Sequence, residues 1–197
     1  MGNNYYDVSD SSASGYKAYT NAAAGLVWSR TSATWEPPDA AKGDIARALL
    51  YMTIRYTGDA ASEPRLTVAD ATNLIVAGST FMGRYSTLLK WHFADPVSAA
   101  EQARNDGVYA YQTNRNPFVD NPEWVAVAFI PPLTIALSGT NIALRWTNDY
   151  IPTMLAEQST NLASAWWTVT NQPVVVSDQN VVVQPMSDPH RFYRLSR

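Results

Sequence analysis

The strongest constraint on the fold is a change of pattern at the segment Phe129-Ile130-Pro131-Pro132. Before this segment, apolar residues recur with a helical period, and after it they alternate as they do in strands. A switch of this kind favours two folding units within one chain. We therefore expect an α+β protein, with an α-rich domain over residues 1–130 and a small all-β sandwich over residues 131–197.

The charge distribution limits what the chain can bind through long-range electrostatics. The net charge is −3, with 14 Lys and Arg against 17 Asp and Glu. This balance argues against the extended basic surface that holds nucleic acid, so any such contact must come from a local cluster. The chain has no Cys, which excludes disulfides and thiolate metal sites.

The chain shows no sign of membrane insertion or of an export signal. Its apolar runs fall short of the roughly 20 residues that a spanning helix requires, so we expect no membrane span. The first residues, Met1 to Tyr6, lack both a basic stretch and an apolar stretch. We expect no signal peptide in this chain.

Four helices are predicted in the first part. One should run over residues 40–56 and end at Gly58 as its C′ residue, and two adjacent apolar stripes indicate that it is nearly surrounded. Helical propensity returns over residues 83–93. Asp95 and Pro96 are typical of an N-cap and N1 pair, which predicts a helix to about Gln112. A short helix should end near Val127, and short strands are expected only around residues 24–29.

The second part contains seven short β segments separated by turns, as in a small sandwich. They lie at residues 133–137, 142–147, 153–158, 166–169, 174–176, 181–184 and 192–195.

Three segments of the first part contain distinctive motifs in a fixed order. They are Glu36-Pro37-Pro38-Asp39 with Lys42 to Tyr56, then Trp91-His92-Phe93-Ala94-Asp95-Pro96 with Glu101 and Arg104, then Gln112 to Pro122. In order and spacing, over residues 36–128, they resemble the bacterial endonuclease I family. The resemblance implies a periplasmic or extracellular, metal-dependent nuclease of the ββα-metal type that cleaves DNA, and also RNA, with little sequence specificity.

In that family a His activates water, and a Glu and an Asn hold one divalent cation, Mg²⁺ or Ca²⁺, which neutralises transition-state charge. These residues belong to motifs upstream of the Glu36 segment. The two His of this chain, His92 and His190, do not follow a Glu. The resemblance therefore implies a partial ββα-metal domain with no metal ligand and no bound metal, inactive alone. His92 is the one catalytic candidate, and a packing role near Asp95 is favoured for it.

Arg47 and Arg55 lie two turns apart on the first long helix. A buried guanidinium must be paired, so we expect both to form an ion-pair frame with carboxylates, among them Asp95 and Glu101. The alternative is that one arginine faces a scissile phosphate.

Polar side chains also share one face of the helix after Asp95. Glu101, Asn105 and Gln112 are spaced to lie together, and Asn114, Arg115 and Asn116 follow in the chain. They would form either a phosphate-binding rim or a set of side-chain bonds that fasten the loop to the helix, which we favour. The predicted binding or structural set is thus Arg47, Arg55, Asp95, Glu101, Arg104, Asn105, Gln112, Asn114, Arg115 and Asn116.

The tail resembles β modules appended to secreted bacterial enzymes, and its ligand is not indicated. Trp166 and Trp167 could stack on a sugar or a base, although one of them suits the sandwich core. The alternative function for the whole chain is a non-catalytic binding or surface-attachment module of a secreted protein.

Overall fold

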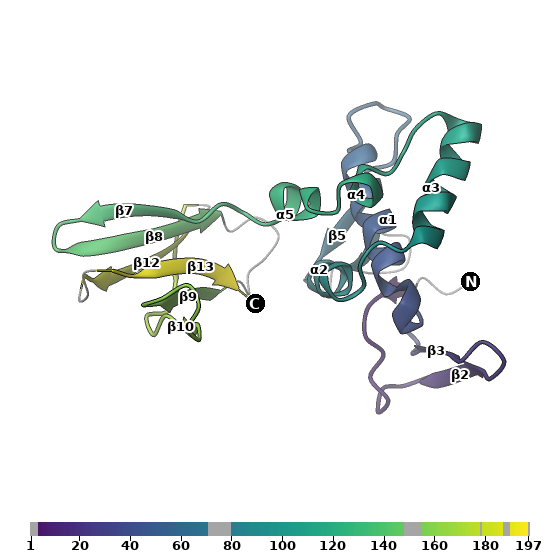
Figure 1. Cartoon of the computed structure of the whole chain (residues 1–197), viewed down its shortest axis with the longest axis horizontal. Helices are drawn as coiled ribbons and strands as arrows, with labels where there is room; N and C mark the ends of the chain where they lie inside the picture. The colour runs from purple at the N-terminus through teal and green to yellow at the C-terminus, as the bar shows by residue number, and fades with distance from the viewer. Residues whose placement is uncertain (1–3, 71–79, 148–154, 178, 187–189, 197) are drawn as a thin grey trace. The chain divides into compact units, whose positions relative to one another are not determined.

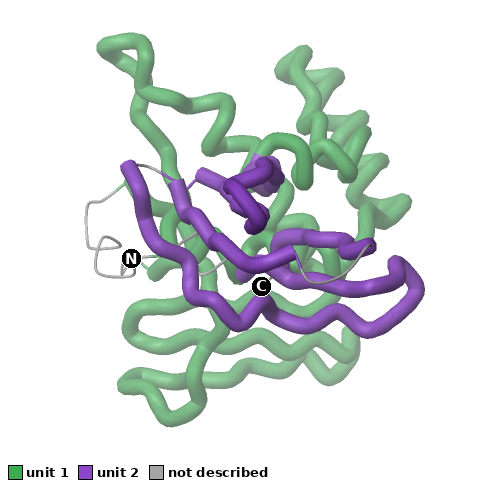
Figure 2. The backbone as a smooth tube through the Cα atoms, turned by 90° about the vertical axis from the view of Figure 1, so that its left-hand side faces the viewer, with its two compact units in different colours: residues 1–128 green, residues 129–197 purple. Residues whose placement is uncertain are grey.

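The computed structural model describes residues 4–70, 80–147, 155–177, 179–186 and 190–196. The chain divides into two compact units, residues 1–128 and residues 129–197 (Figure 2). Helices and strands both contribute, so the α+β expectation is confirmed. No helix in the described ranges has the length and apolar character needed to cross a membrane.

A six-stranded sheet of short strands forms one part of the first unit, in the order β2-β3-β4-β1-β6-β5. Its strands are β1 (Tyr5–Tyr6), β2 (Lys17–Asn21), β3 (Leu26–Arg30), β4 (Thr34–Glu36), β5 (Thr67–Ala69) and β6 (Phe81–Arg84). Strands β2, β3 and β4 pair antiparallel, while β1 pairs parallel with β4 and β6, and β5 with β6. The sequence indicated only the region of β3, because strands of two to five half-exposed residues carry too little alternation.

The helices of this unit are η1 (Asp39–Ala41), α1 (Lys42–Arg55), α2 (Tyr85–Ala94), α3 (Ala99–Gln112), α4 (Pro117–Asp120) and α5 (Trp124–Phe129), the last of which reaches the second unit. Helix α1 packs on α2, and α4 packs against both α1 and α3 (Figure 1). The core between them includes Leu50, Leu88, Phe118 and Val125, which are almost completely buried.

Two predicted helix ends are wrong. Asp95 is the C-cap of α2, and α3 begins after Ser98, whose Oγ accepts a hydrogen bond from the backbone N–H of Glu101 at 3.1 Å. Ser98 and Glu101 have the spacing of a capping box, and this motif, rather than Asp95-Pro96, determines where α3 begins. Helix α1 is capped at Tyr56, so Gly58 is not its C′ residue.

The expectation that α1 is nearly surrounded is also wrong. Ala46 and Leu50 are fully buried, but Ile54 in the same stripe is 45% exposed, and Leu49 and Met52 are half-buried. One side of α1 packs in the core, and the neighbouring side is therefore free to form a surface.

The second unit contains two antiparallel sheets. β7 (Thr134–Ser138), β8 (Asn141–Thr147), β11 (Val174–Val176) and β12 (Gln179–Pro185) pair in the order β11-β12-β8-β7, and β9 (Leu155–Ser159), β10 (Trp167–Thr168) and β13 (Phe192–Ser196) pair in the order β10-β9-β13. The predicted strands are confirmed, except that residues 153 and 154 lie outside the described part. Both sheets contribute to one core: Leu144, Trp146 and Val182 come from the larger sheet and Ala156 from the smaller.

Candidate nucleic-acid-binding cleft

Arg47 of α1 is completely buried and forms the centre of a hydrogen-bonded frame. Its Nε and Nη2 donate to the two carboxylate oxygens of Glu101 at 2.8 and 2.5 Å. Its Nη1 donates to the backbone carbonyl of Asp95 at 2.8 Å. The bidentate geometry matches the guanidinium fork to a carboxylate. The predicted burial and pairing of Arg47 are confirmed, so this arginine is not available to a phosphate.

Gly43 allows the three helices to approach one another at this frame. Its backbone N–H donates to the side chain of Asp95 at 2.8 Å. A Cβ at this position would collide with the Asp95 carbonyl oxygen and with the Arg47 guanidinium. Gly43, Arg47, Asp95 and Glu101 thus fasten the start of α1 to the end of α2 and the start of α3.

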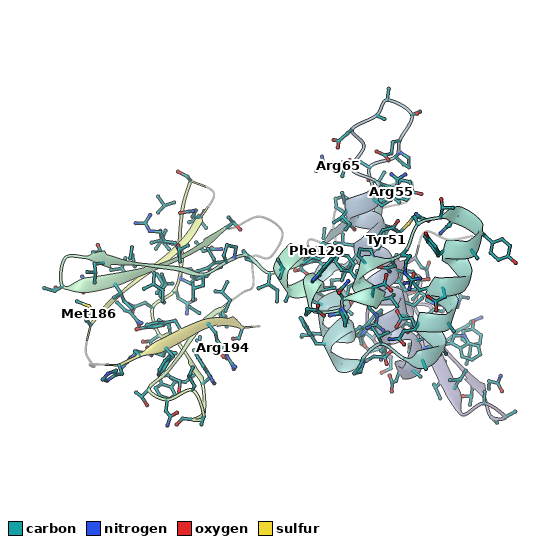
Figure 3. All side chains as sticks on the ribbon, turned by 45° about the horizontal axis from the view of Figure 1, so that its top comes forward. Tyr51, Arg55, Arg65, Phe129, Met186 and Arg194 are labelled. Carbon is teal, nitrogen blue, oxygen red and sulfur yellow. The ribbon has the colours of Figure 1, made fainter. Side chains whose placement is uncertain are left out.

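The prediction that Arg55 is buried is wrong. Its side chain is 52% exposed, and it pairs with Glu63 at 3.1 Å outside the frame. Figure 3 shows Arg55 near Arg65, at the end of α1 from which a loop projects. Eight residues along an α-helix are two turns plus about 80°, so Arg55 projects roughly a quarter-turn round the helix from Arg47.

The loop after α3 is fastened to that helix by amide side chains. Oδ1 of Asn105 accepts from the backbone N–H of Asn116 at 2.9 Å, and its Nδ2 donates to Asp120 at 3.1 Å. The Asn116 side chain donates to the carbonyl of Arg47 at 3.0 Å. These bonds confirm the fastening role that the sequence favoured for Asn105 and Asn116.

Arg115 is also held by carboxylates. It donates to both oxygens of Asp120, at 2.8 and 2.6 Å, and to Asp106 at 2.7 Å. These hydrogen bonds raise the pKa of Arg115 and lower the pKa of Asp120. Since its charge is already compensated, Arg115 does not supply the free cation of a phosphate-binding rim.

A cleft of about 210 Å³ lies between α1, α3 and the fastened loop. Seven members of the predicted set line it: Glu101, Arg104, Asn105, Gln112, Asn114, Arg115 and Asn116. Arg47, Arg55 and Asp95 are not among its lining residues. The other lining residues were not predicted as a site: Asp44, Ala48, Tyr51 and Met52 form the α1 wall, and Val108 and Val119 complete the lining. The signal for the α1 wall was present in the helical spacing of residues 44, 48, 51 and 52.

The chain reverses at the end of α3 to bring Asn114 to the cleft. Thr113, the C-cap, has φ 56° and ψ 15°, a left-handed conformation that ends the helix. Nδ2 of Asn114 then donates to the hydroxyl of Tyr51 at 2.8 Å (Tyr51 is labelled in Figure 3). Its Oδ1 is buried and has no hydrogen-bond partner among the described residues.

The charged groups of the cleft are mostly carboxylates and their partners. Burial and the neighbouring Glu101 carboxyl raise the pKa of Asp44, while Arg47 and Arg104 act in the opposite direction. Arg104 is exposed on α3. It is therefore the guanidinium of this site that is placed to meet a ligand from solvent.

His92 does not line the cleft. Its side chain is 5% exposed and lies edge-on to Phe93, with ring centroids 4.8 Å apart. Burial, followed by the charge of Arg47, lowers the pKa of His92, and a hydrogen bond to the backbone of Pro122 acts against this. We propose that His92 has a packing role rather than that of a base.

The two histidines provide a matched test of this role. Because the folded state favours neutral His92, its contribution to stability should be complete above pH 6.5, the ordinary value, and should decline as the pH falls below it. Urea denaturation should show wild type more stable than His92→Gln near neutral pH, with the difference narrowing in acid. His190, which is exposed, provides the control His190→Gln. A difference for His92→Gln that does not vary with pH would contradict the assignment.

The tail tryptophans differ from each other in environment. Trp167 is 43% exposed, and Trp166 is half-buried beneath Arg194, whose guanidinium lies 4.4 Å from the ring centroid. Neither belongs to the buried core of this unit, which contains Trp146 instead. The expectation that one of the pair fills the core is therefore wrong.

Comparison with known proteins relates the sequence of this chain to a family. The chain is 48% identical over 92 residues to an extracellular ribonuclease of Bacillus amyloliquefaciens, and 47% identical over 92 residues to one of Bacillus subtilis strain 168. Each match covers 46% of this chain and 31% of the relative, so the chain spans about a third of their length. No solved structure matches. The family model described as Endonuclease I matches residues 2–123, and the chain therefore belongs to the endonuclease I family.

Proposed function

We propose that the chain is part of an extracellular nuclease that hydrolyses phosphodiester bonds in RNA and in DNA. The observation that carries the proposal is the family match over residues 2–123, which includes every residue that lines the cleft. The relatives bear the name extracellular ribonuclease, which supports RNA as a substrate and a location outside the cell.

The family is in general metal-dependent, and we propose Mg²⁺ or Ca²⁺ for the complete enzyme. A divalent cation stabilises the charge that develops on the phosphate and on the leaving oxygen. The cleft does not suit such an ion, because both oxygens of Glu101 already accept from Arg47. The described residues contain no group of three His, Asp or Glu side chains able to hold a metal. We therefore assign no catalytic step to the cleft.

The second candidate is a nucleic-acid-binding role without catalysis by this chain. The arrangement of the cleft favours it, because open walls and hydrogen-bonding amides suit binding whereas the metal ligands needed for hydrolysis are not grouped there. On this proposal, residues 1–128 contribute substrate contacts to the nuclease.

Hydrolysis and binding by the purified 197-residue chain test both candidates. We expect it to bind single-stranded RNA in a gel-shift assay but to cleave RNA and plasmid DNA no faster than a buffer control, with magnesium or calcium. EDTA should leave the result unchanged. Rapid cleavage that is abolished both by EDTA and by His92→Ala would show that this chain contains a working site. Failure to bind either nucleic acid would contradict the proposed function.

A further inference from the structure

The size and walls of the cleft restrict what can occupy it. Its apolar lining consists of Ala48 and Met52 of α1, Val108 of α3 and Val119 of α4. Its volume of about 210 Å³ is below the roughly 300–1,000 Å³ of pockets for drug-sized ligands. An apolar space of this size accepts one small ring system and excludes a folded peptide or a duplex.

The polar groups at the cleft suit the edge of a heterocycle. The Asn114 amide has one atom bonded to Tyr51 and one buried atom without a partner among the described residues. If the amide is turned over, Oδ1 bonds to Tyr51 and Nδ2 is left without a partner, so either orientation offers one polar atom to a ligand. A buried polar atom without a partner carries a free-energy penalty that a ligand donor or acceptor removes. Gln112 adds a second amide at the rim.

The charges argue against an anion inside the cleft. Arg115 is shared by Asp106 and Asp120, and Arg47 is shared by Asp44 and Glu101, so each pair of carboxylates leaves an excess of negative charge. Apart from the exposed Arg104, a phosphate would meet carboxylates and their partners there. Arg104, exposed on α3, can contact a phosphate or stack on a ring from outside. The occupant that fits is a neutral, flat, hydrogen-bonding ring attached to an anionic backbone.

We propose that the cleft between α1 and α3 binds one unstacked nucleobase of a single-stranded nucleic acid, with Asn114 and Tyr51 at the base edge and Arg104 beside the backbone. This inference rests on the proposed nuclease function and specifies the substrate form that the site takes. Single strands offer unstacked bases directly, and proteins bind them by stacking and by contacts to the base edge. A duplex base must first leave its stack, which costs free energy.

Two Ala→Leu substitutions, one in the cleft and one outside it, test this proposal. Ala48→Leu enlarges a side chain in the α1 wall and so fills part of the cleft. Ala103→Leu adds the same atoms at an exposed position of α3 outside the lining. The probe is fluorescein-labelled oligoadenylate RNA, alone or paired with oligouridylate, and binding is followed by fluorescence anisotropy of the 197-residue chain. Ala48→Leu should weaken single-strand binding about tenfold, in the range for loss of one stacked base. Ala103→Leu should leave it unchanged, and neither change should affect duplex binding.

Tyr51→Phe provides a second variant that keeps the ring and removes the hydroxyl. It should weaken single-strand binding in the same direction while the thermal unfolding midpoint stays close to that of wild type. If Ala48→Leu unfolds the chain, this variant decides the test. Wild-type affinity for oligoadenylate in folded Ala48→Leu and in Tyr51→Phe would overturn the base site while leaving nucleic-acid binding intact.

Amide chemical shifts identify which part of the nucleotide enters. Adenosine should shift the backbone amides of Tyr51 and Asn114 in the ¹⁵N spectrum, and ribose 5-phosphate and inorganic phosphate should not. Equal shifts with ribose 5-phosphate would make the cleft a phosphate site and overturn the inference. Absence of oligoadenylate binding by wild type would reject the inference, and absence of binding to both RNA and DNA would also reject the proposed function, so the two failures are distinguishable.

Discussion

Replacing Arg47 with alanine should lower the free energy of unfolding of residues 1–128 by about 3–5 kcal/mol, the cost of breaking a buried ion pair. The carboxylate of Glu101, which is 5% exposed, would lose both guanidinium bonds and remain buried with its charge. The Asp95 carbonyl would lose a hydrogen bond as well. Urea denaturation followed by far-ultraviolet circular dichroism measures the loss.

Arg55→Ala is the matched control, since Arg55 lies on the same helix in an exposed ion pair with Glu63. Its loss should cost at most about 1 kcal/mol. The double variant Arg47→Met with Glu101→Leu removes both buried charges and should be more stable than Arg47→Ala. Equal stability of wild type and Arg47→Ala would contradict the frame.

Replacing Trp146 with alanine should destabilise the second unit by about 3–5 kcal/mol, because it removes a large side chain that is 2% exposed in the core. We propose that the two units fold independently, so the loss should be confined to residues 129–197. Hydrogen exchange measured by mass spectrometry should show faster exchange in β8 and β12 and unchanged exchange in α1 and α3.

Trp167→Ala is the control for this prediction, because Trp167 lies in the same unit but is 43% exposed. Its effect on stability should be within about 0.5 kcal/mol. Faster exchange in α1 of the Trp146→Ala variant would show that the two units unfold together, and the proposed boundary near residues 129–132 would be wrong.

The strands of the second unit and the main helices were predictable because their patterns are local. Leu144 and Trp146 alternate with Arg145 and Thr147, and Ala46 and Leu50 follow a helical period. Arg47 was predictable for a different reason: a guanidinium on an apolar helix face requires a carboxylate. Strands such as β1, with two residues, depend on partners far along the chain and leave no local signal.

The cleft was predictable on one side only. Glu101, Asn105 and Gln112 showed a polar face on α3, whereas Met52 was interpreted as part of an apolar stripe and Ala48 belonged to neither stripe. Periodicity alone does not distinguish an apolar residue in a core from one in the wall of a cleft. The direction of Arg55 was missed because two helical turns are 7.2 residues rather than eight.

The Arg47 frame has a consequence for the order of events during synthesis. Arg47 precedes its partner Glu101 by 54 residues, and Asp95 by 48. Until Glu101 has left the ribosome, docking α1 would bury a guanidinium whose remaining carboxylate partner is Asp44 of its own helix, at 3.4 Å, which is unfavourable. Helix α1 must therefore stay hydrated while residues 56–100 are made, and its apolar side is open to chaperones during that interval. Once Glu101 has left the ribosome, Arg47 can bind it and α1 can pack with α2 and α3.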